Sequence, residues 1–502
     1  TAWPNYACIC RVVSNHGGGV HWPQQGLQVA AMERSVQAST LRAGGSADDQ
    51  SSTRALLRDA AERAANYLES LDARAVAPSA AALSGLLRLE APLPAQGSDA
   101  RQTLALLDEL VSPATMAMAG PRFFGFVIGG SLPAALAANW LAAAWDQNAA
   151  FNSITPGVAR LEQSALRRLI ALFELPPETA AGFVTGATVA NFTALAAARH
   201  AVLTRVGWNV ESDGLFGAPP ITVIAGDEAH PSLLKSLGML GLGRSRIVRV
   251  ANDGQGRMLP DALPEIAGPT ILCLQAGNVN TGAFDPFGAL IERAHRAGAW
   301  VHVDGAFGLW AKATASLRHL VEQMETADSW ATDAHKWLNV PYDSGVAFVR
   351  DAHALKAAMA ITADYLPQAA GGERNPCDFT PEVSRRARGV EVWAALQSLG
   401  RSGLAEMIER NCRQARRFAA GLSAKGYAVL NDVVLNQVLV SFGDDARTRG
   451  VVARLQADGT CWCGITVWQG HTAMRISVSN WSTGDHDVEK SLEAMLRAAA
   501  SV

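Results

Sequence analysis

The amino-acid sequence predicts an α/β fold whose large domain has a mostly parallel central sheet. Between about Gly120 and Gly389, short apolar runs rich in β-branched residues alternate with stretches of helical periodicity. Glycine, proline or aspartate follows each run, as is typical where a strand ends. The runs are apolar throughout, which indicates strands buried on both faces of a parallel sheet. The expected parallel strands include residues 221–225, 270–274, 300–303 and 345–349.

The segment before this region predicts an arm and a helical part. Residues 1–50 are rich in Gly, Ser and Gln without a persistent period, so we expect a poorly ordered arm. Residues 51–119 show helical patterning and predict two helices joined around Pro78, Pro92 and Pro94.

The segment after Gly389 predicts a smaller α+β part. Long helices are expected at 390–399 and 404–425, then strands at 433–442 and 474–478 and a closing helix. The chain is therefore expected to divide into the arm (1–50), an N-terminal helical segment (51–119), the large α/β domain (120–389) and a small C-terminal α+β domain (390–502).

Composition limits the classes of function. The 502 residues are 49% hydrophobic, and the formal net charge is only −3, with no long run of Lys or Arg. Nucleic acid and anionic membranes are therefore not expected as partners. The most apolar run, 132–145, is too short to cross a bilayer and predicts a buried helix, placed at a subunit contact. Residues 1–13 do not resemble a secretory signal.

Seven scattered cysteines indicate reduced thiols and a cytoplasmic protein. Two Cys-x-Cys pairs, Cys8/Cys10 and Cys461/Cys463, could together supply four zinc thiolates. Structural zinc sites usually space paired ligands by two to four residues, so we expect core thiols or a frayed arm instead, and no metal.

Polar residues follow several of the expected strands, at the edge where ligands bind in such sheets. A glycine turn and the start of a helix place Ala187 and Thr188 where amides and a hydroxyl suit a phosphate, although any tight strand-to-helix turn needs the same glycine. His230 after the next strand is either structural or able to stack on a planar ring. Asn278 is either part of a plain turn or of a polar rim.

Two further strand-end residues suggest a specific cofactor. Asp304 ends an apolar strand, where a carboxylate is costly unless it is paired. A protonated pyridine nitrogen would pair it, and pyridoxal phosphate (PLP) needs that proton to act as an electron sink. Lys336 follows His335 after the next helix, and a lysine in such a setting can form a Schiff base, although an isolated His-Lys pair is usually a surface feature.

Taken together, these stretches resemble a known family. The matching segments are 121–126, 182–195, 229–232, 281–286, 302–306, 333–337 and 384–386. They look like the group II PLP-dependent decarboxylases, which include the aromatic-L-amino-acid, glutamate and histidine decarboxylases. The resemblance implies the PLP-dependent transferase fold of type I, a homodimer with sites near the interface, and decarboxylation of an L-amino acid to its amine.

The resemblance also implies roles for individual residues. Lys336 would form the Schiff base with PLP, Asp304 would pair with the pyridine nitrogen, and His230 would stack on one face of the ring. The remaining cofactor contacts would come from Ala306 on the other ring face, Ala187 and Thr188 at the phosphate with His335 nearby, and Asn278 in the polar rim.

The chain departs from the family pattern at three places. Asn278 stands in a segment that differs from the Gly-Thr-Thr of many relatives, and Asp333 stands where an asparagine is common. The stretch 368–378 has no tyrosine, whereas relatives use a loop tyrosine to protonate Cα. An aldehyde synthase is therefore an alternative. An aminotransferase, with Arg475 binding the α-carboxylate, is another.

The substrate is not determined by these motifs. By family analogy Phe126 and Gly129 line the pocket, and Trp140 lies nearby in the sequence. These residues favour an aromatic or bulky amino acid.

Overall fold

The computed structural model describes residues 47–361 and 373–502. The chain divides into two compact units, Thr1–Ala55 and Leu56–Val502. The first contains only the start of α1 (Ala47–Ser70) among the described residues, and the second contains both β-sheets. Most of the expected arm lies outside the described residues, and α1 begins at Ala47 rather than after residue 50.

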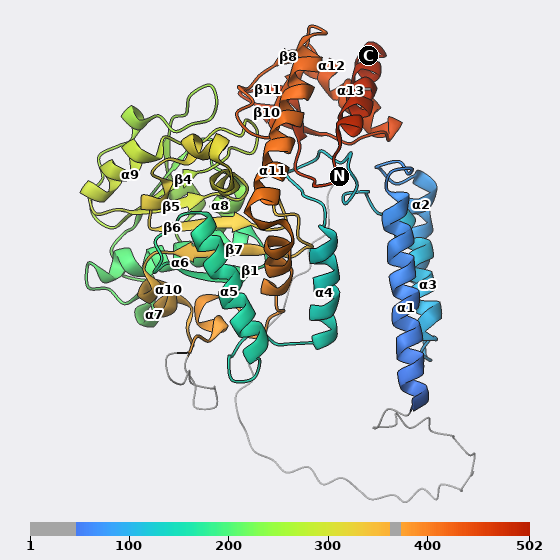
Figure 1. The fold of residues 1–502 in the computed structure, drawn as a ribbon. Helices are drawn as coiled ribbons and strands as arrows, with labels where there is room; N and C mark the ends of the chain where they lie inside the picture. The colour runs from blue at the N-terminus through green and yellow to red at the C-terminus, as the bar shows by residue number, and fades with distance from the viewer. Residues whose placement is uncertain (1–46, 362–372) are drawn as a thin grey trace, which may run out of the picture. The chain divides into compact units, whose positions relative to one another are not determined.

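The larger sheet has seven strands in the order β1-β7-β6-β5-β4-β2-β3, and it confirms the predicted α/β fold (Figure 1). Pairing is parallel among β2 to β6, and β7 is antiparallel to both of its neighbours. The strands are β1 (Ala180–Val184), β2 (Thr222–Gly226), β3 (Val248–Val250), β4 (Thr270–Gln275), β5 (Trp300–Asp304), β6 (Ser329–Asp333) and β7 (Gly345–Val349).

The prediction that 345–349 is a parallel strand was wrong. Residues 345–349 do form the buried strand β7, but it runs antiparallel to β6. Only the segment 334–344 joins β6 to β7, and it contains no helix. A parallel pairing needs a crossover connection of a dozen or more residues, usually through a helix. Burial on both faces gave β7 the same apolar pattern as the parallel strands of the sheet.

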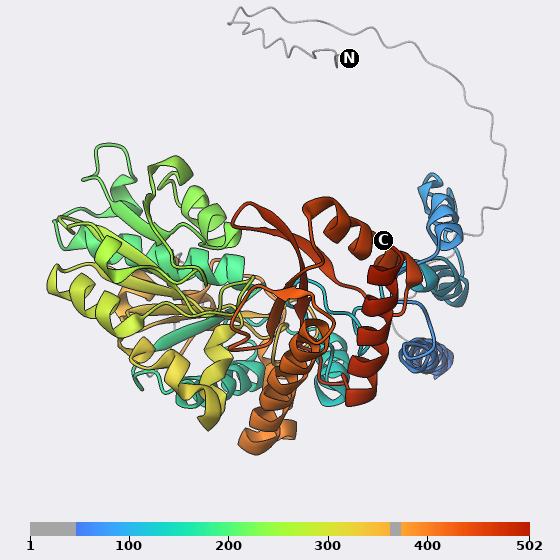
Figure 2. The ribbon, with the colours of Figure 1, turned by 90° about the horizontal axis from the view of Figure 1, so that it is seen from above.

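Helices lie on both faces of this sheet, as Figures 1 and 2 show. On one face α6 (Ala187–Thr204) contacts β5, β6 and β7 and also packs on α8 (Pro231–Met239) and α10 (Ala352–Met359). On the other face α5 (Pro156–Leu172) and α9 (Phe287–Arg296) share a hydrophobic core with the sheet. The short helix α7 (Val210–Asp213) follows α6.

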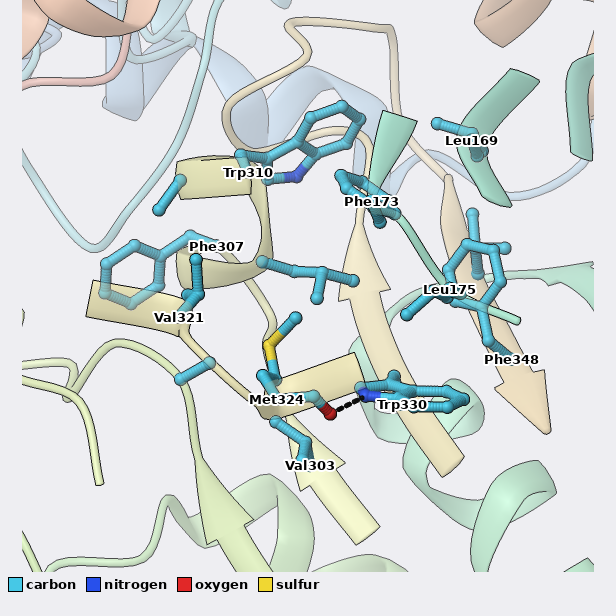
Figure 3. Close-up of a cluster of buried hydrophobic side chains, with 14 of the residues drawn as sticks. Leu169, Phe173, Leu175, Val303, Phe307, Trp310, Val321, Met324, Trp330 and Phe348 are labelled. Atoms are coloured by element: carbon cyan, nitrogen blue, oxygen red, sulfur yellow. Dashed lines mark hydrogen bonds between the residues drawn. The ribbon is translucent and has the colours of Figure 1, made fainter. Parts of the chain in front are cut away.

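Successive side chains of β5 point to opposite faces, and this alternation positions the site. Val301 and Val303 belong to the core on the α5 side, whereas Trp300 belongs to the core on the α6 side. By the same period, His302 and Asp304 lie on the α6 side. The α5-side core also contains Phe173, Trp310, Trp330 and Phe348 around β6 and β7, and the Trp330 indole donates to the Met324 carbonyl at 2.9 Å (Figure 3).

A second, antiparallel sheet follows the large one in the chain, with the order β10-β11-β9-β8. The expected strands at 433–442 and 474–478 correspond to β9 (Gln437–Ser441) and β11 (His471–Ser477), whereas β10 (Gly464–Trp468) was missed. Exposed Ile465 and Val467 alternate with less exposed residues along this edge strand. The remaining elements are β8 (Ala428–Val429), α11 (Gly389–Ser423), α12 (Asp445–Asp458) and α13 (Asp485–Ala500).

The two long helices expected after Gly389 form one element with a kink. Gly400 interrupts α11 with φ 61° and ψ −177°, a conformation that favours glycine. The break falls between the two predicted segments, 390–399 and 404–425. The domain boundaries at 119/120 and 389/390 stay predictions.

The helical segment before residue 119 contains α1, α2 (Ala80–Gly85) and α3 (Ala100–Leu110). The two expected helices correspond to α1 and α3, and the proline-rich connection also includes α2 and a short 3-10 turn. Arg63 of α1 pairs with Asp108 of α3 at 2.9 Å.

The apolar run 132–145 forms α4 (Pro133–Trp145), but the prediction that this helix is buried was wrong for the single chain. Trp140, Leu141 and Trp145 are 45%, 54% and 46% exposed, and only Ala135 and Ala142 of the helix are buried. A helix that is apolar on all sides has no polar face to mark which side meets water. Its sequence therefore looks the same whether it is buried within one chain or covered only by a second subunit. Among the described helices, none combines the length and hydropathy needed to span a bilayer.

Candidate active site

Side chains from several strand ends meet at one edge of the large sheet. The strands β2, β5 and β6 are part of its parallel portion, so their carboxyl ends share that edge. Asp304 ends β5 and Asp333 ends β6, while His230 follows β2. Lys336 lies in the turn after β6, with its Nζ 3.1 Å from Asp333 Oδ2.

Lys336 is the lysine placed to react with a carbonyl at this edge. The sequence has six lysines. Lys312 is also buried, but Glu174 and Glu325 hold its ammonium group at 3.4 and 2.8 Å. Lys336 is 19% exposed, which leaves its amine accessible from the sheet edge. The other lysines lie on the surface: Lys235, Lys356, Lys425 and Lys490.

Asp304 is a buried carboxylate held by two donors. Asn191 Nδ2 of α6 donates to Asp304 Oδ2 at 3.0 Å, and the Ala306 amide donates to Asp304 Oδ1 at 3.2 Å. These two hydrogen bonds fix the orientation of the carboxylate. The carboxylate is 4% exposed, so a cationic group brought beside it would interact strongly.

The amide of Asn191 is oriented by a buried chain of hydrogen bonds behind it. Asn191 Oδ1 lies 2.8 Å from His302 Nε2, and His302 Nδ1 lies 2.9 Å from Ser329 Oγ. Burial lowers the pKa of His302 to about 3, so the imidazole is neutral near pH 7. Its single proton is then on Nε2, donating to Asn191, while Nδ1 accepts from Ser329. The Trp300 indole donates to Ser329 Oγ at 2.9 Å, so every donor in the chain is directed toward Asp304.

The amino end of α6 forms an anion-binding turn beside these residues. The Ala187 amide, at the first position of α6, donates to Asp333 Oδ1 at 2.5 Å. Glycines allow the close approach of β7, because a Cβ on Gly345 would lie 2.5 Å from Gly186 Cα. Thr188 follows in the same helical turn and is partly exposed, so its hydroxyl is available to a ligand.

His335 closes the other side of this turn. Its Nδ1 donates to the Ser344 carbonyl at 2.9 Å, and its Nε2 lies 3.7 Å from Asp333 Oδ2. Burial lowers the pKa of His335, which favours the neutral imidazole. The ring of Tyr342 packs on it with 4.2 Å between centroids, and partial burial raises the pKa of Tyr342 to about 12. Tyr342 therefore stays protonated near neutral pH.

His230 caps α8 and lies close to the same charges. Its Nδ1 accepts from the Ser232 amide at 3.2 Å, and Ser232 Oγ is 2.7 Å away. Burial lowers the pKa of His230, and the charges of Asp304, Lys336 and Arg475 act on it as well. A neutral ring fixed at its Nδ1 side presents a face suited to stacking.

Asn278 is turned into its own loop. Its Oδ1 accepts from the amides of Asn280 and Thr281 at 2.8 and 3.2 Å, and the residue is 1% exposed. The side chain therefore stabilises the turn after β4, and its role as a cofactor contact stays a prediction. Ala306 lies beside Asp304 and is partly buried, consistent with a small residue next to a ring.

Arg475 carries a guanidinium that no described Asp or Glu pairs. It donates to the carbonyls of Val279 and Phe126 at 3.2 and 3.4 Å, and to Asn280 Oδ1 at 3.4 Å. Burial lowers the pKa of Arg475 to about 10, still well above neutrality. Because its charge also acts on His230, Arg475 lies close enough to the site to attract an anionic group.

Aromatic side chains lie next to Arg475. Trp462 is stacked between Phe123 and Phe126, with ring centroids 5.1 and 5.8 Å apart. Phe126 is 60% exposed. A Cβ on nearby Gly129 would lie 2.0 Å from the Lys336 carbonyl oxygen, so only glycine lets this segment pass the lysine.

The sequence missed the roles of Asn191, His302 and Tyr342, and it considered Arg475 only as the carboxylate-binding residue of an aminotransferase. Asn191 and His302 lie inside segments that were recognised, yet their side chains could be connected only once α6 was placed against β5. Tyr342 and Arg475 come from a turn and from the second sheet. A signal for His302 did exist, because a histidine two residues before Asp304 must lie on the same face of the strand.

The thiols give no support to a metal centre. Cys461 and Cys463 are buried, and burial raises the pKa of Cys463 well above its usual range. Cys8 and Cys10 lie outside the described residues. Within residues 47–361 and 373–502, no cluster of three or more His, Cys, Asp or Glu side chains is arranged to hold a metal ion.

Comparison with protein families decides between the chemistries that this geometry allows. The family model of the pyridoxal-dependent decarboxylase conserved domain matches residues 86–443. The chain belongs to the pyridoxal-dependent decarboxylase family. Its cofactor is therefore PLP, and its reaction is the decarboxylation of an amino acid, which makes it a carboxy-lyase.

Individual relatives agree with this assignment. The chain is 27% identical to tryptophan decarboxylase 1 of Oryza sativa subsp. japonica over 497 residues, covering 91% of this chain and 95% of the relative. It is 26% identical to an aromatic-L-amino-acid decarboxylase of Bacillus atrophaeus, covering 70% and 73%. A crystal structure of Oryza sativa TDC with PLP and tryptamine superposes with a TM-score of 0.83 at 25% identity, covering 91% and 98%.

The side chains present fit this cofactor. A buried carboxylate (Asp304), an accessible amine (Lys336) and a helix amino end at Ala187 are what a pyridine nitrogen, an aldehyde and a phosphate respectively require. Asp333, which already accepts from the Ala187 amide, is the one residue of the site that carries the wrong charge for a phosphate neighbour.

We predict that the hydrogen-bond chain behind Asp304 supports turnover. Replacing Asn191 with Ala removes a hydrogen bond to a charged group, a contribution of about 1.5–3 kcal/mol, so kcat should fall about 10- to 100-fold. Ser329→Ala, at the far end of the chain, should have a smaller effect. Turnover and bound PLP, measured together, test this. An Asn191→Ala enzyme with wild-type kcat would contradict the role.

Proposed function

We propose that the protein decarboxylates an aromatic or bulky L-amino acid with PLP carried on Lys336. The observation that carries the proposal is the pairing of a buried, hydrogen-bonded carboxylate, Asp304, with an accessible amine, Lys336, at one sheet edge. The phosphate would be held by Ala187 and Thr188 at the start of α6, with His335 beside it. His230 and Ala306 would flank the ring.

The chemistry that PLP supplies when bound is an electron sink for the pair released as the Cα–carboxylate bond breaks. Asp304 would keep a proton on the pyridine nitrogen, because an ionised carboxylate in a buried site favours a cation beside it. The neutral imidazole of His302 and the hydroxyl of Ser329 would hold the amide of Asn191 in place. Asn191 would in turn hold the carboxylate of Asp304. These residues act by position and charge and exchange no atoms with the substrate.

Two features support an aromatic or bulky substrate. The exposed ring of Phe126, stacked on Trp462, offers an apolar surface near the site. The relatives named tryptophan decarboxylase and aromatic-L-amino-acid decarboxylase cover most of this chain. Arg475 adds a cation that would attract the substrate's carboxylate toward the site.

The proton that replaces carbon dioxide at Cα needs a donor. The stretch 368–378 has no tyrosine. Lys336 and His335 are two candidates for this proton donor, and a tyrosine of the partner subunit is a third. With neutral His335 favoured and its Nδ1 proton committed to Ser344, the supply of protons is limited. We therefore propose that protonation is slow and that part of the flux yields aldehyde when oxygen is present.

The products distinguish these outcomes. Purified enzyme should be screened with L-amino acids while carbon dioxide, amine, aldehyde and peroxide are measured together in air. We expect carbon dioxide from an aromatic amino acid, with amine in less than equal amount and aldehyde making up the difference. Amine equal to carbon dioxide would contradict slow protonation only. Release of carbon dioxide from no amino acid would contradict the proposed function.

We also propose that the enzyme is a homodimer. Trp140, Leu141 and Trp145 are large apolar side chains that α4 exposes to water, and neighbouring exposed apolar side chains of this kind are typical of a protein interface. An apolar groove next to these side chains is lined by Leu68 of α1 and Leu136 of α4, among others. A cytoplasmic location stays an expectation that rests on the free thiols. The five cysteines that the structure describes are all unpaired and buried.

Charging this surface should separate the subunits. The double change Trp140→Glu and Leu141→Glu places two carboxylates where an apolar contact is expected, so the mass in solution should fall from twice 52.9 kDa to that of one chain. Leu93→Glu, at a residue that is 95% exposed elsewhere, is the control and should leave the mass unchanged. Light scattering measures both. A double variant that stays dimeric would place the interface elsewhere.

A further inference from the structure

The carboxylate of Asp333 accepts from the first amide of α6, one of the groups at a helix start that could otherwise bind a phosphate. Its Oδ1 accepts from the Ala187 amide at 2.5 Å, and its Oδ2 lies 3.1 Å from Lys336 Nζ. Asp333 is 3% exposed, so this contact is fully part of the protein interior. One side chain therefore engages both groups that the cofactor requires, the amide at the start of α6 and the reactive amine.

Because it lies at the start of a helix, the carboxylate of Asp333 takes the place that an anionic ligand could have at the Ala187 amide. The first amides of an α-helix lack intrahelical acceptors and attract anions, and α6 extends over 18 residues. Asp333 satisfies one of these amides and is paired by the lysine ammonium. The other titratable groups near it are His335, with Nε2 at 3.7 Å, and Tyr342 and His230, on both of which its charge acts.

We propose that the carboxylate of Asp333 competes with PLP for the cofactor's binding groups, the amide at the start of α6 and the amine of Lys336. To bind the cofactor, the carboxylate must give up the Ala187 amide and Lys336, and it then lies beside a phosphate of the same charge sign. Like charges at such short distances in a buried site repel strongly. His335 offers no compensating positive charge while its imidazole is neutral. PLP is therefore held more weakly than in the same site with a neutral side chain.

This competition has a consequence for the enzyme in solution. Without the cofactor, Asp333 would keep both the Ala187 amide and the Lys336 ammonium paired. The loaded fraction then follows the concentration of free PLP. The inference rests on PLP binding at this site and does not depend on which amino acid is decarboxylated.

The direct test is Asp333→Asn in the full-length protein. Asparagine keeps an oxygen for the Ala187 amide, removes the charge and adds a donor for the phosphate. Dissociation constants should be measured for PLP and for 4′-deoxypyridoxine 5′-phosphate, which has no aldehyde to react with Lys336. We expect both to bind at least about tenfold more tightly to the variant, or about 1.4 kcal/mol. Asp227→Asn, an exposed aspartate after β2, is the matched control and should change neither constant.

Thermal unfolding is a second measurement. It distinguishes competition between Asp333 and PLP from a purely structural role of Asp333. Without ligand, Asp333→Asn should unfold at a lower temperature than wild type, because the ion pair with Lys336 is lost. With PLP, its midpoint should rise by more than that of wild type. A structural role would lower both midpoints by the same amount and leave the ligand-induced rise unchanged.

Three outcomes separate this inference from the proposed function. Equal or weaker binding of both ligands by Asp333→Asn, with normal PLP binding by wild type, would overturn the competition alone. Failure of PLP to bind either protein would contradict the proposed function as well. If Asp333→Asn does not fold, Asp333→Ser removes the same charge with a smaller side chain, and tighter binding by that variant is again the expected result.

Discussion

The need to hold one ionised carboxylate inside an apolar sheet organises the site. Asp304 lies at the end of a strand that is buried on both faces, where an unpaired charge would be costly. Asn191 and the backbone amide of Ala306 satisfy it on the protein side. The chain through neutral His302 then fixes the direction of the asparagine amide. In the proposed role, the pyridine nitrogen of PLP would be the cationic partner of this carboxylate.

The same sheet edge contains two carboxylates with opposite consequences. In the proposed roles, Asp304 would favour the cofactor by pairing with the ring nitrogen, and Asp333, which accepts from the Ala187 amide, would oppose it by lying beside the phosphate. Lys336 lies 3.1 Å from the second of them, so the amine is drawn toward the anion-binding turn until the cofactor displaces that contact. If Asp333 competes as proposed, binding of PLP would rearrange charges already present at this edge of the sheet.

Much of the fold followed from apolar patterning, and the exceptions have identifiable causes. The strand that carries Asp304 lies in buried parallel pairs, as its apolar pattern predicted, whereas the strand that carries Asp333, β6, was not predicted. The direction of β7 depends on the length of its connection, and the exposure of Trp140 depends on what covers α4. Asn191 lies in a segment that the sequence singled out, but its hydrogen bond to Asp304 depends on the packing of α6 against β5. Arg475 was named only for an aminotransferase, and it approaches the site from the second sheet.

The central claim is that PLP is carried on Lys336, and borohydride reduction tests it most directly. Reduction of the PLP-loaded enzyme makes the link between cofactor and lysine permanent, and peptide mapping then identifies which of the six lysines carries it. The account predicts one labelled peptide, the one containing Lys336, and no label in Lys336→Ala. Label on Lys312 or on a surface lysine, or a reducible adduct that survives in Lys336→Ala, would contradict the account.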